Sequence, residues 1–262
     1  MGTLGRMADY PFRTALVTGA SSGIGEVMAA KLADAGVATT VVARRADRLD
    51  ALARHHEGIT PLVADLATTE GQAAVAARIA EGDLDLVVNN AGFGTNGDFH
   101  TLDPDRLAEE IEVNVAALTR LSHAALAVMV PRGSGYLLNV SSVASFQPAP
   151  ELAVYAATKA YVTSLTESLH EEAAPHGVHV TALCPGLTKT EFQAVSNTAT
   201  YADEFPSFVW TSPDEVASCG LDGVAANRTL AVPGAQYKMM VAATNITPRW
   251  IRRRASSLIR RN

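Results

Sequence analysis

The stretch that decides the fold is ALVTGASSGIGEVMAAKLADAG, residues 15–36. A short apolar run ends at Gly19, and two more glycines follow at positions 23 and 25. Apolar residues then recur at i, i+3, i+4 and i+8, as one face of a helix requires: Ile24, Val27, Met28 and Leu32. Gly36 suits the left-handed position that ends a helix. The stretch predicts a buried strand, a tight glycine turn and a helix that packs on a sheet.

The same alternation continues along the chain. Further apolar runs predict strands at 38–44, 59–66, 84–92, 135–142 and 178–186. Helical patterns lie around them, at 24–35, 45–55, 71–80, 104–129 and 155–174. Strands that are apolar on both faces and separated by helices indicate a parallel sheet covered on both sides. We therefore expect an α/β fold with one doubly wound domain over 13–246, an N-terminal extension over 1–12 and a tail over 247–262.

Composition narrows the function classes. Of the 262 residues, 48% are apolar and 18% are charged, which is typical of a globular chain. No apolar run approaches the roughly 20 residues that span a bilayer. The N-terminus lacks a signal core and the two cysteines make no disulfide framework, so we expect a cytoplasmic protein. The net charge is −6, and because the tail holds six arginines the remainder is strongly acidic, which argues against nucleic-acid binding.

The glycine turn suits a phosphate ligand. Gly19 permits the turn, whereas Gly23 and Gly25 remove side chains where a ligand or the strand must approach the helix. The N–H groups around Ser21, Ser22 and Ile24, with the helix dipole behind them, would seat a diphosphate. An ordinary glycine-rich connection is the alternative.

The spacing T-G-x-x-x-G-x-G at residues 18–25 resembles the cofactor motif of the short-chain dehydrogenase/reductase family. The resemblance covers about residues 13–235 and implies a Rossmann-type domain that binds a nicotinamide dinucleotide. It also implies further motifs in a fixed order along the chain.

The second predicted strand ends in Arg44 and Arg45, where an acidic residue would favour NAD. A guanidinium at this place can pair with a 2′-phosphate, so we expect NADP(H), with Arg44 as the stronger candidate because it lies nearest the strand end. Two solvated arginines are the alternative. The resemblance places Asp65 and Leu66 near the adenine, although Asp65 could equally cap the next helix.

Asn89-Asn90-Ala91-Gly92 closes the fourth strand and matches the NNAG motif of the family. Paired asparagines can tie strand ends together, and the resemblance puts Asn90, Ala91 and Gly92 close to the cofactor. Asn114 lies inside a helical pattern, where Asn is unfavourable. In the family an Asn here loosens the helix and holds a water beside the catalytic lysine; a solvated Asn is the alternative.

Tyr155 and Lys159 lie four residues apart on a predicted helix, and Ser142 precedes the tyrosine by thirteen residues. This matches the Ser…Tyr-x-x-x-Lys group of the family, with Ser141 as a competitor for the serine role. An ammonium near a phenol lowers its pKa, so Lys159 would tune Tyr155 as proton donor while Ser142 holds the substrate oxygen. A surface pair is the alternative for Tyr155 and Lys159 taken alone.

The segment Cys184-Pro185-Gly186-Leu187-Thr188-Lys189-Thr190 resembles the PG segment near the nicotinamide. The resemblance places Pro185, Gly186 and the Thr188 backbone at the carboxamide and the Thr190 hydroxyl near the phosphates. We expect a buried, unreactive Cys184 and no metal site.

Residues 187–212 form a predicted substrate lid rich in aromatic residues: Phe192, Tyr201, Phe205, Phe208 and Trp210. They favour an apolar substrate such as a lipid-like or 3-oxoacyl ketone, unless they only pack on the protein. Ser212-Pro213-Asp214-Glu215 predicts a helix start. The tail predicts a basic amphipathic helix capped by Thr247. This helix would bind a membrane surface, the body of its own chain or another subunit.

These features together favour an NADPH-dependent ketone reductase. An alcohol dehydrogenase in the oxidative direction and a non-catalytic NADP(H) sensor remain alternatives. Relatives assemble through helices like the one bearing Tyr155, so we expect a homodimer or homotetramer.

Overall fold

The computed structural model describes residues 10–197, 206, 209–248 and 250–251. Its centre is a parallel sheet with strand order β3-β2-β1-β4-β5-β6-β7. The strands are β1 Thr14–Thr18, β2 Ala38–Ala43, β3 Ile59–Val63, β4 Leu86–Asn89, β5 Gly135–Val140, β6 Val178–Leu183 and β7 Leu230–Ala231. The order reverses between β1 and β4, and in such sheets ligands bind outside the carboxyl ends of the strands at that reversal.

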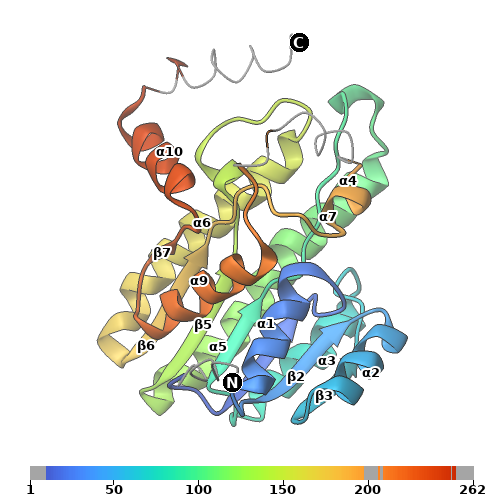
Figure 1. The fold of residues 1–262 in the computed structure, drawn as a ribbon, viewed down its shortest axis with the longest axis vertical. Helices are drawn as coiled ribbons and strands as arrows, with labels where there is room; N and C mark the ends of the chain where they lie inside the picture. The colour runs from blue at the N-terminus through green and yellow to red at the C-terminus, as the bar shows by residue number, and fades with distance from the viewer. Residues whose placement is uncertain (1–9, 198–205, 207–208, 249, 252–262) are drawn as a thin grey trace, which may run out of the picture.

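Helices connect the strands and cover the sheet (Figure 1). The long ones are α1 Gly23–Asp34, α2 Ala46–His55, α3 Thr69–Ala80, α4 Pro104–Ile111, α5 Leu118–Arg132, α6 Ala153–Ala173, α9 Pro213–Ala225 and α10 Ala235–Ile246. Shorter turns are η1 Phe99–Thr101, η2 Glu112–Ala117, η3 Val143–Phe146, η4 Ala174–His176 and α7 Phe192–Val195. The doubly wound Rossmann-type α/β domain is confirmed.

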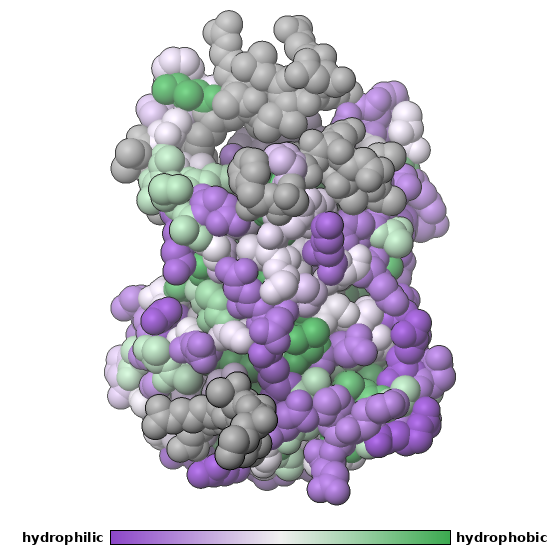
Figure 2. Space-filling model, viewed as in Figure 1, coloured by the Kyte–Doolittle hydropathy of each residue, from purple (hydrophilic) through white to green (hydrophobic). Residues whose placement is uncertain are grey.

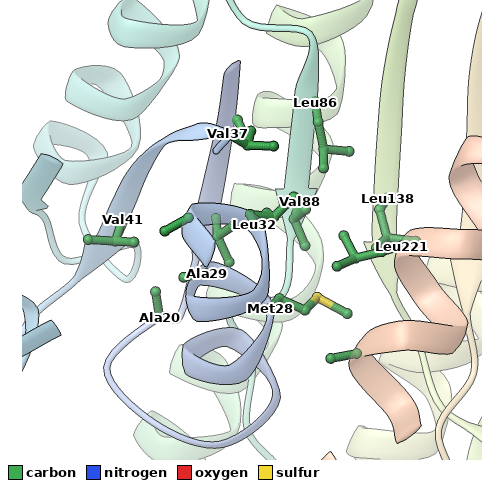
Figure 3. Packing of buried hydrophobic residues seen from close by; sticks show 14 of the residues in the cluster. Ala20, Met28, Ala29, Leu32, Val37, Val41, Leu86, Val88, Leu138 and Leu221 are labelled. Carbon is green, nitrogen blue, oxygen red and sulfur yellow. The ribbon is translucent and has the colours of Figure 1, made fainter. Parts of the chain in front are cut away.

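Two apolar cores lie on the two faces of the sheet. One core joins α1, α2 and α9 to the sheet, and the other joins α3, α5 and α6. In Figure 3, Met28 and Leu32 of α1 point toward Val88, Leu138 and Leu221. The helix face predicted from the spacing of residues 24–32 is therefore the face that packs on the sheet.

Five of the six predicted strands appear with shorter ends, several predicted helices are longer, and the structure adds elements that the sequence pattern missed, among them β7 and α10. Strand β7 has two residues, too few for a period, and α10 begins at Gly234 without a side-chain cap. The single helix expected over 104–129 is interrupted by the wide π-helical turn η2. Helix α9 starts as expected, with Ser212 Oγ accepting from Glu215 N at 3.1 Å.

Among the described residues, one helical stretch, Pro104–Arg132, is long and apolar enough to cross a membrane by length and composition alone. Its side chains Leu121, Ala125 and Met129 are buried against the sheet, so we interpret it as a core helix. Hydrophilic residues gather at the lower right of Figure 2, over the region where Figure 1 places α2 and α3.

The carboxyl ends of the strands face the end of the molecule where α10 lies (Figure 1). The segment after β6 and α10 lie at that carboxyl edge. The tail lies almost wholly outside the described residues. Thr247, expected to cap it, donates its hydroxyl to Ala243 O of α10 instead.

Candidate active site

The glycine turn between β1 and α1 is built from left-handed backbone and close packing. Gly19 and Gly23 have φ of +67° and +62°, which side chains adopt at a cost. A Cβ on Gly25 would come within 3.0 Å of Asn90 Nδ2 and of Gly19 O. Each glycine is therefore required, two by backbone conformation and one by the approach of helix to strand.

Asn90 ties this turn to the neighbouring strand. Its Nδ2 donates to Thr18 O at 2.8 Å and to Gly19 O at 3.3 Å, while Thr18 Oγ1 accepts from the N–H groups of Asn90 and Ala91 at 3.0 Å each. Asn89 donates to Asn139 Oδ1 of β5 at 2.9 Å. The prediction that the paired asparagines join strand ends is confirmed.

The two arginines after β2 have different partners. Arg45 reaches the glycine turn, where its Nε and Nη2 donate to Ser21 Oγ at 3.1 and 3.0 Å, and its Nη1 lies 2.9 Å from Glu191. Arg44 points to the other side, 3.5 Å from Glu109 and 3.9 Å from Asp65. The structure thus brings Arg45 rather than Arg44 against the turn.

Asp65 does not cap α3. Its Oδ1 accepts from Ala67 N at 3.0 Å, and the cap of α3 is Thr68, whose hydroxyl accepts from Gly71 N at 3.1 Å. Of the two roles weighed for Asp65, the capping role is therefore wrong. Leu66 beside it is buried in the core.

Asn114 lies in the wide turn η2 and is fully buried. Its Nδ2 donates to Phe93 O at 2.8 Å and to Thr158 Oγ1 at 3.1 Å, and its Oδ1 accepts from Phe93 N at 3.1 Å. The alternative of a solvated Asn is wrong, and the helix is loosened where the residue type indicated it.

Ser142, Tyr155 and Lys159 converge at the end of β5. The Ser142 side chain lies close enough to the Tyr155 phenol to lower its pKa. The Lys159 ammonium donates to Val140 O at 2.8 Å and lies 5.8 Å from the centre of the Tyr155 ring. Ser141 points elsewhere, donating to Lys159 O at 2.9 Å, so the serine beside the tyrosine is Ser142.

Burial dominates the proton affinities of this group. It raises the pKa of Tyr155 to about 12, against a smaller lowering by the Ser142 side chain. Burial also lowers the pKa of Lys159 to about 8. The expectation of a lowered Tyr155 pKa is wrong for the chain by itself, because removing the phenol from water raises its pKa and the nearby Glu110 and Cys184 raise it further.

Gly92 and Gly94 bring a loop against this group. A Cβ on Gly92 would lie 2.8 Å from Asn114 Oδ1 and 3.3 Å from Lys159 Nζ, and one on Gly94 would lie 3.1 Å from the Tyr155 ring. The loop after β4 therefore forms one wall of the site. The role of Gly94 was not foreseen, although its place two residues after the NNAG motif could have indicated it.

The PG segment lies across the site from β5. Pro185 O accepts from Val143 N at 2.9 Å. A Cβ on Gly186 would strike the ring of Tyr237, whose hydroxyl accepts from Leu187 N at 2.9 Å and donates to Val209 O at 2.7 Å. Tyr237 comes from α10, which the sequence analysis did not identify.

Thr188 and Thr190 reach toward the site from this segment. Thr188 O accepts from Gln193 Nε2 at 2.7 Å. A Cβ on Gly23 would lie 3.1 Å from Thr190 Cβ, so the Thr190 side chain covers the glycine turn, while its hydroxyl accepts from Phe192 N at 3.2 Å.

Two of the predicted lid aromatics are described. Phe192 lies against Tyr155, with ring centres 5.4 Å apart, and Lys189 Nζ lies 5.7 Å from the Trp210 ring centre. The other three, Tyr201, Phe205 and Phe208, fall outside the described residues. Cys184 is buried, as expected, and burial raises the pKa of its thiol to about 12.

The residues at the glycine turn fit a dinucleotide. Ser22, the N-cap of α1, makes no side-chain bond to the first turn of the helix; its hydroxyl faces Glu191 instead. The first N–H groups of α1 are thus free of a side-chain cap and suit diphosphate oxygens. Arg45 adds a positive charge directly beside them.

Comparison with known proteins identifies the family. The short chain dehydrogenase family model matches residues 13–200, more than half of the chain. An uncharacterized oxidoreductase of Myxococcus xanthus is 39% identical over 197 residues, which cover 73% of this chain and 78% of the relative.

Solved structures agree with this. A short-chain dehydrogenase from Sphingobium yanoikuyae in complex with NADPH is 32% identical with a TM-score of 0.81, covering 88% of this chain and 93% of that one. A bulky-bulky ketone specific alcohol dehydrogenase from Comamonas testosteroni is 30% identical with a TM-score of 0.77, covering 89% and 92%. The chain therefore belongs to the short-chain dehydrogenase family and is an NAD(P)-dependent oxidoreductase.

Proposed function

We propose that this enzyme reduces an apolar ketone to a secondary alcohol with NADPH, and that Tyr155 is the proton donor. The observation that carries the proposal is the convergence of Ser142, Tyr155 and Lys159 at the carboxyl end of β5. They lie at the same edge of the sheet as the glycine turn, where a nicotinamide cofactor of this family would be held.

Each side chain has one task. The Tyr155 hydroxyl gives its proton to the substrate oxygen, and its raised pKa keeps it protonated until the reaction begins. Ser142, beside Tyr155, orients the same substrate oxygen. The Lys159 ammonium stabilises the phenolate left behind. The bound cofactor supplies the hydride that reaches the carbonyl carbon.

Asn114 holds the wall of the site. Its three hydrogen bonds fix the Phe93 backbone and Thr158 next to Lys159. We propose that a water held beside this amide and Lys159 returns the proton to Tyr155.

For the cofactor, we propose NADP(H). The N–H groups from Ser21 to Gly25 would hold the diphosphate, with Thr190 covering it. Arg45, with Arg44 behind it, would pair with the 2′-phosphate, and Asp65 and Leu66 would border the adenine. Asn90, Ala91, Gly92 and the Pro185–Thr188 backbone would line the rest of the cofactor. The Sphingobium relative, which binds NADPH, supports this choice.

An apolar substrate is supported by Phe192, which lies over Tyr155 and would contact whatever carbonyl Tyr155 protonates. The ketone specificity of the Comamonas relative points the same way. Oxidation of an alcohol by the same residues, and cofactor sensing without catalysis, are the competing functions.

The test is NADPH consumption with a panel of aliphatic, polycyclic and acyl-thioester ketones. Tyr155→Phe should reduce kcat about 10²–10⁴-fold and leave NADPH affinity unchanged, because only the proton donor is lost. Turnover of alcohols with NADP alone would select the oxidative function. Tight NADPH binding without turnover of any ketone or alcohol would select the sensor.

We also propose a homo-oligomer formed through the α4–α6 face. Phe99, Ile111 and Tyr161 are large, exposed and apolar there, and line one open groove with Val115 and Val154. Light scattering should give a dimer or tetramer for the wild type and a smaller species for Ile111→Asp.

Both cysteines are free, which fits a cytoplasmic enzyme. Membrane or subunit contact by the tail stays a prediction.

A further inference from the structure

Glu110 is a buried carboxyl group that the proposed chemistry does not use. It lies in the last turn of α4, is 0% exposed, and precedes Asn114 by one helical turn. Within the described part of the chain neither of its oxygens has a hydrogen-bond partner. Carboxylates are almost never fully buried unless a positive charge compensates them.

The surroundings of Glu110 contain few groups that could compensate it. The Thr95 hydroxyl and N–H are directed at its carboxyl group and lower its pKa, but burial raises the pKa by more. Arg106, on the same helix, directs Nη1 to Glu109 at 2.9 Å and Nη2 to Val195 O at 3.4 Å. Among the described residues two positive groups act on Glu110: Arg106, whose effect on its pKa is the larger, and Lys159, on the helix against which α4 packs.

Lys159 is a buried positive charge without a negatively charged hydrogen-bond partner among the described residues. It is 4% exposed, and the bond that its ammonium makes is to a neutral carbonyl, Val140 O. Burial lowers its pKa to about 8, which nearby Cys184 and Glu110 oppose. Cys184 cannot supply the negative charge near neutral pH, because burial raises the pKa of its thiol to about 12 and Glu167 raises it as well.

We propose that Glu110 is a positioning residue that supplies the buried negative charge opposite the Lys159 ammonium. The proposal rests on the proposed function only in giving that ammonium a catalytic partner. Glu110 touches neither substrate nor cofactor; it acts through Lys159, and it approaches the site across the wall formed by Gly94 and Thr95.

The direction of the effect follows from the charges. Glu110 favours the protonated form of Lys159 and opposes ionisation of Tyr155. Without the carboxylate, Lys159 therefore loses its proton at a lower pH and Tyr155 loses its proton more readily. The ammonium needed to stabilise the phenolate then disappears within the working pH range.

NMR titration of the lysine side chains tests this directly. The chain has four lysines, so ¹³C,¹⁵N-lysine labelling gives four resolvable signals, and Lys159→Arg assigns the relevant one. In Glu110→Gln the Lys159 midpoint should fall by about one pH unit. Glu172→Gln, which removes an exposed carboxylate from the same helix as Lys159, should leave it unchanged.

Kinetics give a second readout. The alkaline limb of kcat for ketone reduction should move to lower pH in Glu110→Gln by the same amount, with KM for NADPH changed less than about twofold. If Glu110→Gln does not fold, Glu110→Met offers a neutral, apolar side chain and should give the same titration shift. An unchanged Lys159 midpoint in a folded variant overturns the proposal, whether or not any ketone is reduced.

Discussion

The β1–α1 and β6–α9 connections meet at the same edge of the sheet, but they are held in different ways. The first, Gly19–Ser22, is four residues long and is fixed by backbone conformation and by Asn90 from the next strand. The second, Cys184–Ser212, is long, and the residues of it that the structure describes are held by side chains of other segments, above all Tyr237 of α10. The cofactor end of the site is thus specified locally, and the substrate end by distant residues.

The largest effect should come from filling the short connection. Gly25→Ala places a methyl group within 3.0 Å of Asn90 Nδ2 and Gly19 O, and neither can move without breaking the β1–β4 link. We expect a loss of about 1–3 kcal/mol in the free energy of unfolding and no measurable NADPH binding, by chemical denaturation and fluorescence titration.

Glu26→Ala, on the exposed side of the same turn of α1, is the control and should stay within about 0.5 kcal/mol. Normal NADPH affinity in Gly25→Ala would show that the close approach of helix and strand is not needed for the cofactor.

A smaller effect should come from the arginines that border the short connection. Arg45→Ala should weaken NADPH about 10–100-fold and NADH little, because a charge-assisted bond to the 2′-phosphate contributes about 1.5–3 kcal/mol. Arg44→Ala should lose less, since Arg44 points away from the glycine turn, toward Glu109 and Asp65. The measurement is the affinity of the wild type and of both variants for NADPH and for NADH, by calorimetry.

Arg54→Ala removes an exposed arginine elsewhere on α2 and controls for net charge. Equal losses of NADPH and NADH in Arg45→Ala would refute the 2′-phosphate role.

The smallest effect should come from the long connection. Tyr237→Phe removes the hydroxyl that joins Leu187 N to Val209 O, so we expect about 1–2 kcal/mol less stability. KM for the ketone should rise while the Kd of NADPH stays constant, because the Tyr237 hydroxyl holds the segment after β6 and makes no contact with the Gly19–Ser22 connection that would seat the diphosphate. Met239→Leu, an exposed change on the same helix, should alter neither. A weaker NADPH affinity in Tyr237→Phe would show that the two connections are coupled.

The features that the sequence predicted correctly are those set by residues close together in the chain. The glycine turn, the strands beside it and the Tyr155–Lys159 pair depend on residues a few positions apart, whose spacing carries the information. Asn114 also predicted the local loosening of the helix, because an amide inside an apolar helical pattern needs hydrogen-bond partners.

What it missed depends on the assembled sheet. Glu110 lies in the run EEIE, which reads as a solvated helix face, and only packing of α4 on α6 buries it. Arg45 rather than Arg44 meets the turn because α2 begins immediately after Arg45 and sets the direction of its side chain. The Tyr155 pKa was misjudged because burial cannot be read from the four-residue spacing.

The wide turn Glu112–Ala117 also has a bearing on protein engineering. A π-helical turn accommodates one residue more than a regular turn, so it marks the place where the α4–α5 rod tolerates a change of length. Excising a single residue there would convert the rod to uniform winding, and because the wide turn already absorbs the extra residue, α4 and α5 would stay nearly in phase while Asn114 lost its place in the turn. Designers who shorten or graft this rod should therefore count residues from Asn114 in both directions.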